Sequence, residues 1–280
     1  MTPHFEWSRG SKRRLARLEL QSESKHLQAF FDSDHQVADF EPDVEVVAES
    51  SVIISLQKWI TSPRSQALAI GGSLSTVSPS PSAMISACYA CFAREAQLPV
   101  LSHFCTLPTH ELPGQTLHQQ GLIGLTYSLI RQLIDNLPTV VDSDSLLDLT
   151  AERFRKVDGT PASWAAALSL VDTLFHFAPP VLICIVDGID KIHDDSTDVA
   201  LRELIRVLLS HTRYRPAVSG DSTGTTFLFK LLFTVAGRPS ALVETMSENE
   251  PYLSTQTLTE EFASSDAVLT SDLDAVMMNA

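Results

Sequence analysis

Short apolar runs alternate with longer amphipathic segments along most of the chain. The runs are typical of strands covered on both faces, because such strands lose the alternation of polar and apolar residues. They predict strands at residues 67–70, 100–106, 181–186 and 226–236, with a short edge strand at 252–258. Strands that alternate with helices favour a parallel sheet with right-handed crossovers.

The amphipathic segments predict helices at residues 44–60, 82–95, 121–137, 163–177 and 198–211. Ser80 and Pro81 suit a helix start, because a serine side chain caps free N–H groups and proline at the first position lacks one. The apolar stripes of residues 121–137 and 198–211 are expected to pack in the core, since each helix on a sheet buries one face. The alternative is that these stripes bind a partner.

Composition divides the chain into three parts. Residues 1–45 are polar and charged, with their basic residues in the first 25 positions and one possible helix, and are interpreted as a partly disordered extension outside the core. Residues 46–260 form the domain, and residues 261–280 are interpreted as an acidic, flexible tail. We therefore expect a single α/β domain: a three-layer sheet of about five parallel strands with helices on both faces.

Charge and hydropathy exclude several classes of protein. The net charge of −14 disfavours nucleic-acid binding, which needs clustered Lys and Arg. No apolar run approaches the roughly 20 residues that span a bilayer. We expect a cytoplasmic protein, with nuclear or organellar targeting by the basic N-terminus as the alternative.

Four cysteines fit a reducing compartment. Cys105 and Cys184 lie in apolar, strand-like runs, while Cys88 and Cys91 form a C-x-x-C pair in a predicted helix. Zinc needs four converging ligands, so we interpret all four cysteines as core residues rather than a metal or redox site.

The run at residues 181–186 leads into Asp187, then Gly188, Ile189 and Asp190. Its acids would lie at the carboxyl edge of the sheet, where ligands of α/β proteins bind. In an ATPase the first acid would hold Mg²⁺ through water and the second would orient the attacking water. The structural alternative is that Asp187 only caps the next turn.

The phosphate-binding half of such a site is incomplete. Gly71 and Gly72 close the first strand, and the pattern G-x-x-x-x-G-K-[ST] requires a lysine where Val77 stands. When the pattern is counted from Gly71, only Ser78 matches, at the final Ser/Thr position. No basic residue lies between Arg64 and Arg94, so no neighbouring lysine compensates.

Two further groups of polar residues follow later strands. Arg238 lies just past the run at 226–236, after Thr234, where a cation could sense a γ-phosphate; the alternative for Arg238 is a surface arginine in a turn. A cluster of His193, Asp194, Asp195 and Asp198 is interpreted as a solvated helix entry without a metal.

With these residues in view, residues 46–258 resemble the NTPase domain of fungal STAND proteins, the NACHT or nephrocystin-3-like group of signalling P-loop ATPases. The resemblance rests on LQKWITSPRSQALAIGG, PVLSHFC, GLIGLTYSLIRQLI, VLICIVDGIDKI and LLFTVAGRPSAL. It implies a Walker B acid at Asp187, a second acid at Asp190, a sensor arginine at Arg238 and a polar partner at Thr234. The nucleotide, ATP or ADP with Mg²⁺, would contact Gly71, Gly72, Ser78, Thr234 and Arg238.

Two departures from the family bear on function. Val77 replaces the Walker A lysine, and little chain follows residue 258 for the family's lid and repeats. We expect a pseudo-ATPase that acts as a binding or scaffolding module with protein partners, either with weak nucleotide binding or with no ligand at all. The alternatives are an active ATP-dependent STAND switch and a structural protein whose helices bind a partner.

Overall fold

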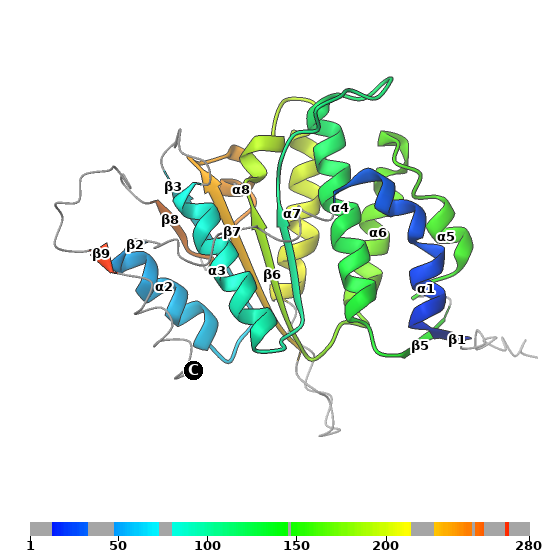
Figure 1. Cartoon of the computed structure of the whole chain (residues 1–280), viewed down its shortest axis with the longest axis horizontal. Coiled ribbons are helices and arrows are strands. Elements are labelled where there is room, and N and C mark those ends of the chain that lie inside the picture. The colour runs from blue at the N-terminus through cyan, green and yellow to red at the C-terminus, as the bar shows by residue number, and fades with distance from the viewer. Residues whose placement is uncertain are drawn as a thin grey trace, which may run out of the picture.

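A computed structural model describes residues 13–32, 48–72, 80–144, 147–213, 227–247, 250–254 and 267–268 of the 280-residue chain. Its central sheet has five parallel strands in the order β4-β6-β7-β3-β8 (Figure 1). Their bounds are β3 Gln66–Gly72, β4 Val100–Phe104, β6 Val181–Asp187, β7 Leu228–Ala236 and β8 Tyr252–Ser254. The predicted α/β fold with a five-stranded parallel sheet is confirmed.

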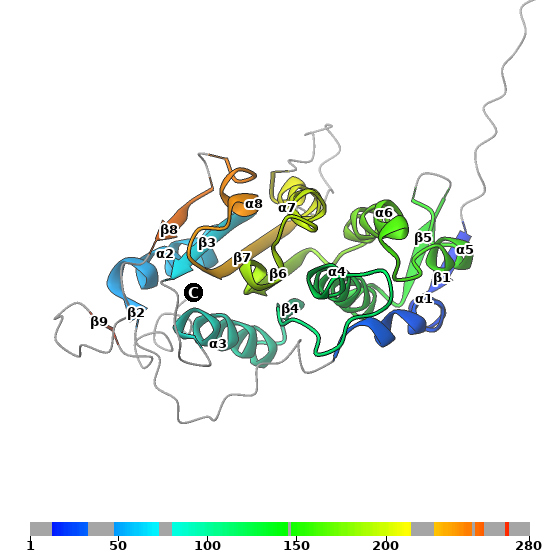
Figure 2. The ribbon, with the colours of Figure 1, turned by 90° about the horizontal axis from the view of Figure 1, so that it is seen from above.

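Helices cover both faces of this sheet, which makes three layers (Figure 2). On one face, α2 (Ser50–Thr61) and α3 (Pro81–Glu95) pack on a cluster that includes Ile183 and Ile185 of β6. On the other, α4 (Leu117–Asn136), α6 (Trp164–Phe175) and α7 (Asp198–Arg213) share a core with Leu182 and Cys184. Successive residues of a strand point to opposite faces, so a run apolar throughout fills both layers.

Helix starts follow from capping residues. Ser80 Oγ accepts a hydrogen bond from the Ala83 N–H, and Pro81 is the first residue of α3, as predicted. Helix α4 begins earlier than the leucine pattern indicates, because Thr116 and Gln119 form a capping box ahead of it. Helix α2 begins later than predicted, at Ser50, and residues 44–47 lie outside the described residues.

Residues 13–32 belong to the core, contrary to the interpretation of this region as an extension. They form β1 (Arg13–Ala16), α1 (Arg17–Glu23) and the 3₁₀ helix η1 (Lys25–Phe30). Strand β1 pairs antiparallel with β5 (Val140–Ser143), which was not predicted. The side chains of Leu15, Leu20 and Leu27 are at most 2% exposed in the main core cluster. Residues 1–12 and 33–45 lie outside the described residues.

Short elements complete the described parts of the chain: α5 (Ala151–Arg155), η3 (Pro161–Ser163), η4 (Ile189–Ile192) and α8 (Ser240–Val243). A further antiparallel pair joins β2 (Ala48–Glu49) to β9 (Ala267–Val268). The rest of the expected acidic tail lies outside the described residues. Within the described parts, no helix combines the length and apolar character needed to cross a bilayer.

Candidate functional site

The carboxyl ends of β6 and β7 bring Asp187 together with Thr234, the polar partner that the resemblance implied. The two residues are direct partners in the parallel register. They lie on the face covered by α3, because Ile185 and Leu232, two positions earlier in each strand, pack in the α2–α3 cluster. As whole residues, Asp187 and Thr234 are 2% and 0% exposed.

A chain of hydrogen bonds joins α3 to the Asp187 carboxylate. Thr234 Oγ1 donates to Asp187 Oδ1 at 2.6 Å, and Ser86 Oγ of α3 lies 2.6 Å from Thr234 Oγ1. With Asp187 ionised, the single hydroxyl proton of Thr234 is used on the carboxylate, so Ser86 donates to Thr234. The sequence analysis did not identify Ser86, because nothing in a helix of small residues marks one serine as inward-facing.

The Asp187 carboxylate is held in a buried, destabilising position. Burial raises its pKa, while the hydrogen bond from Thr234 and the positive charge of Lys191 act in the opposite direction. Without such partners, a buried carboxylate would lower the stability of the folded protein by several kcal/mol, because its charge would be unpaired. Thr234 and Lys191 therefore offset the cost of burying the Asp187 carboxylate at the end of β6.

Lys191 is the second residue that the sequence analysis missed. Its Nζ lies 3.8 Å from Asp187 Oδ2. Gly188 has a φ of 73°, and a Cβ placed there would lie 3.0 Å from both Cε and Nζ of Lys191. The lysine side chain thus crosses the glycine and reaches back to the acid. The segment between Arg64 and Arg94 has no lysine, and Lys191 comes instead from η4, in the opposite half of the site.

Asp190 points to the end of β7 rather than to Asp187. Its Oδ1 accepts a hydrogen bond from the Ala236 N–H at 3.0 Å. The Gly188 N–H donates to the Thr234 carbonyl at 2.7 Å, so both bonds fix η4 on β7. In this arrangement Asp190 holds the backbone at the end of β7 in place. Its other carboxylate oxygen takes no part in the bond to Ala236.

Gly71 and Gly72 allow a close approach between β3 and the turn after β7. The Gly237 N–H donates to the Gly72 carbonyl at 2.6 Å. A Cβ at Gly71 would lie 2.5 Å from the Gly237 carbonyl oxygen and 2.4 Å from the Tyr252 hydroxyl, distances that atoms do not tolerate. Gly71 is therefore required by packing, whatever it does for a ligand. Ser78 lies outside the described residues.

Arg238 reaches the same sheet edge but rests on an aromatic ring. Its guanidinium carbon lies 5.1 Å from the centre of the Tyr252 ring, a cation–π contact. Burial raises the pKa of Tyr252 to about 12, although the charge of Arg238 lowers it. The Tyr252 hydroxyl donates to the Gly237 carbonyl at 2.6 Å. The contacts place Arg238 on the β8 side of the site, apart from the Ser86–Thr234–Asp187 chain.

The residues beside Asp187 do not fit Mg²⁺. In nucleotide sites this ion is held by one or two carboxylates together with substrate phosphates and water, so it would need an Asp187 oxygen that faces no cation. One Asp187 oxygen accepts from Thr234, and the other faces the Lys191 ammonium at 3.8 Å. A divalent cation at that oxygen would meet a like charge.

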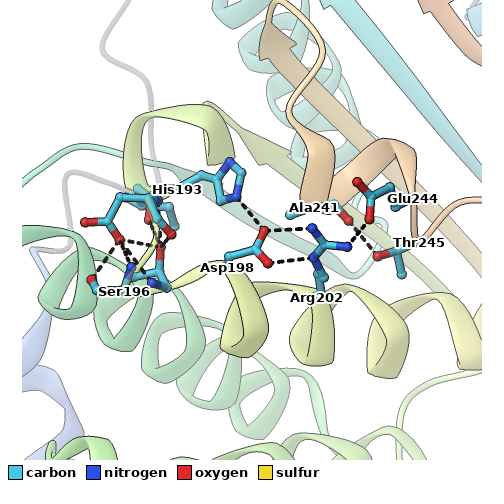
Figure 3. Close-up of polar contacts among 10 residues, drawn as sticks. His193, Ser196, Asp198, Arg202, Ala241, Glu244 and Thr245 are labelled. Atoms are coloured by element: carbon cyan, nitrogen blue, oxygen red, sulfur yellow. Dashed lines mark hydrogen bonds and ion pairs between the residues drawn. The ribbon is translucent and has the colours of Figure 1, made fainter.

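The polar cluster after Asp190 forms the predicted helix entry and extends beyond it (Figure 3). Asp194 accepts hydrogen bonds from the N–H groups of Ser196 and Thr197 ahead of α7. His193 Nε2 lies 2.9 Å from Asp198 Oδ1, and Arg202 joins Asp198 to Glu244 just after α8. This chain of charges connects the segment after η4 to α8.

None of the four cysteines, all of which lie in the described residues, forms a disulfide. Cys105 and Cys184 are buried, as predicted, and burial raises the pKa of both thiols. Cys88 is half-buried and Cys91 is exposed on α3, so the prediction of core packing is wrong for Cys91.

Comparison with models of known protein families and with curated proteins found no match to this chain. The fold class therefore rests on the sheet and its helical layers.

Proposed function

We propose that the chain is a degenerate P-loop NTPase-like domain of the STAND or NACHT type that acts as a binding or scaffolding module with weak or no ATP hydrolysis. The observation that carries this proposal is the Lys191 ammonium 3.8 Å from the buried Asp187 carboxylate. The acid that would position Mg²⁺ in an active enzyme already has a positive partner from its own chain.

The sheet order supports the P-loop-like part of the proposal. In this interpretation β3 is the Walker A-like strand, β6 the Walker B-like strand and β7 the sensor-like strand. Strand β7 lies between the other two and provides Thr234, which contacts Asp187. All three strands end at the same edge, where ligands of parallel sheets bind.

The missing charges support loss of hydrolysis. Phosphoryl transfer depends on cations placed around the transferred phosphate, and removing one such group costs about a hundredfold or more in rate. Val77 occupies the place of the loop lysine, and Arg238 lies on Tyr252. Asp190 uses one carboxylate oxygen to accept from the Ala236 N–H, which leaves it less free to orient a water.

The two amphipathic helices offer little support for the alternative of a helix-mediated interaction protein. The inward leucines of α7, Leu201, Leu204 and Leu208, are at most 1% exposed, and most of α4 is buried. A partner would bind other surfaces, and the net charge of −14 favours proteins over nucleic acids. Four cysteines without a disulfide support a reducing, cytoplasmic setting.

A phosphate-release assay with ATP and Mg²⁺ tests the proposal. We expect the wild-type chain to release no more phosphate than Asp187→Asn, because neither protein has a complete set of catalytic charges. Turnover in the wild type that depends on Mg²⁺ and disappears in Asp187→Asn would instead support the active ATPase.

A further inference from the structure

The two oxygens of Asp187 have partners of different kinds. Oδ1 accepts the Thr234 hydroxyl proton inside the core, and Oδ2 faces the Lys191 ammonium. The Asp187 side chain is 3% exposed, whereas that of Lys191 is 47% exposed. The ion pair therefore has a buried negative end and a positive end that is open to solvent.

The open end lies where a ligand would bind. Lys191 belongs to η4, which follows β6 directly at the carboxyl edge of the sheet. An ammonium group has three N–H donors, and one directed at Asp187 leaves the others for an anion. Burial and the Thr234 bond fix Asp187, and Gly188 lets the lysine fold back over the turn. The positive group is thus held in place without a metal.

We infer that Lys191 takes the place of Mg²⁺ beside Asp187 and binds a phosphate-bearing ligand without a divalent cation. This inference rests on the proposed function, because it concerns the same strand ends. Lys191 neutralises the buried acid and directs its remaining donors at the phosphate oxygens. A metal ion would have to displace the ammonium from Asp187 before it could bind.

Isothermal titration with ATP, ADP and pyrophosphate, in EDTA and in excess magnesium chloride, tests this role. We expect binding in EDTA to be at least as tight as with Mg²⁺. Lys191→Gln should weaken it by about tenfold or more through loss of charge-assisted hydrogen bonds, and Lys191→Arg should retain most of it. Equal binding of pyrophosphate and ATP would identify the phosphate groups alone as the recognised chemistry; tighter ATP binding would show that the nucleoside also contributes.

Lys156→Gln is the matched control. Lys156 forms an exposed ion pair with Glu152 at 3.3 Å and has the same four-residue spacing as Lys191 and Asp187. It should leave phosphate binding unchanged. Binding that requires Mg²⁺, survives Lys191→Gln or is absent for all three ligands would overturn the inference. Absence of binding would leave the proposal of a non-hydrolysing module intact, so the two can fail separately.

Thermal unfolding gives a second readout that needs no phosphate. We expect Mg²⁺ to leave the melting temperature of the wild type unchanged relative to an ionic-strength control. In Lys191→Gln the unpaired acid should gain a Mg²⁺-dependent rise, and in the double variant Asp187→Asn, Lys191→Gln the rise should disappear. A wild-type response as large as that of Lys191→Gln, or no response in either protein, would contradict the substitution of Lys191 for the metal.

Discussion

Gln132 of α4 covers the outer edge of the sheet at β4. Its Oε1 accepts from the Ser102 N–H and its Nε2 donates to the Ser102 carbonyl, both at 2.9 Å. The side-chain amide thus makes the pair of hydrogen bonds that a neighbouring strand would make. An uncovered edge strand pairs readily with other chains, so this one glutamine helps define where the sheet ends.

Replacing this amide by a carboxylate tests its contribution. Gln132→Glu is expected to lower the free energy of unfolding by about 2 kcal/mol, because an acceptor would then face the Ser102 carbonyl in a buried position. Urea denaturation measures the change. Gln57→Glu, the same substitution on an exposed position of α2, should change stability little. Similar effects from the two variants would show that the amide pairing at β4 contributes nothing specific.

At the residue scale, half of the candidate site could be predicted from the sequence. Asp187 ends β6 and Thr234 lies two residues before the end of β7, so strand polarity alone places both near one edge. Ser86 and Lys191 could not be found in this way, because their importance depends on contacts made in three dimensions. Ser86 becomes part of the site because α3 packs on β7 and brings its hydroxyl to Thr234. Lys191 becomes part of it because the turn at Gly188 directs its side chain back to Asp187.

Helix α2 is attached to the sheet by a buried lysine. Lys230 of β7 is 1% exposed, and its Nζ donates to the carbonyls of Trp59, Ser62 and Arg64 at 2.6, 2.6 and 2.8 Å. These carbonyls lie at and after the end of α2, where a cation complements the helix dipole. Burial lowers the pKa of Lys230 to about 8, so the amine is largely protonated at neutral pH.

Removing this amine should loosen α2 from the sheet. We expect Lys230→Met to destabilise the protein by about 3 kcal/mol, because methionine fills the space but leaves buried carbonyls without donors. Hydrogen exchange should increase most in α2, which would locate the effect. Lys58→Met, at an exposed position of the same helix, is the control. An unchanged exchange rate in α2 would contradict this role.

At the scale of elements, the sequence predicts best where a pattern is long or wholly apolar. The run ending in Asp187 and the leucines of α4 have one simple explanation each, a buried strand and a core helix. Strand β5 has only four residues that alternate between exposed and buried, too few for its period to stand out. Leu15 and Leu20 are buried through pairing with β5 and packing on α4, so their basic surroundings concealed a core segment.

On the scale of the whole molecule, one buried histidine links acid stability to the packing of α6 on α7. His211 Nε2 lies 3.0 Å from Asp172 Oδ1, and its ring stacks on Phe175 with centres 4.4 Å apart. The His176 ring is a second titratable neighbour, 5.8 Å away. Burial lowers the pKa of His211, although Asp172 acts in the opposite direction. The folded protein therefore resists protonation of this ring more than the unfolded chain does.

The sign of the pH effect follows from this difference in proton binding. Below the ordinary pKa of 6.5 the unfolded chain takes up the proton first, so the free energy of unfolding falls as pH decreases from about 7 to 5. Hydrogen bonds from Arg202 and His193 lower the pKa of Asp198, so its contribution is lost only below its ordinary value of 3.8. The two effects therefore occupy separate pH ranges.

His211→Phe should make the free energy of unfolding depend less on pH between about pH 7 and 5. Phenylalanine preserves the stacking on Phe175 and cannot be protonated. The half-exposed Asp172 can be hydrated once its partner is gone. Urea denaturation at a series of pH values measures the slope, with His26→Phe as the control for a histidine near the surface. If wild type and His211→Phe lose stability in parallel between about pH 7 and 5, the acid sensitivity originates elsewhere in the fold.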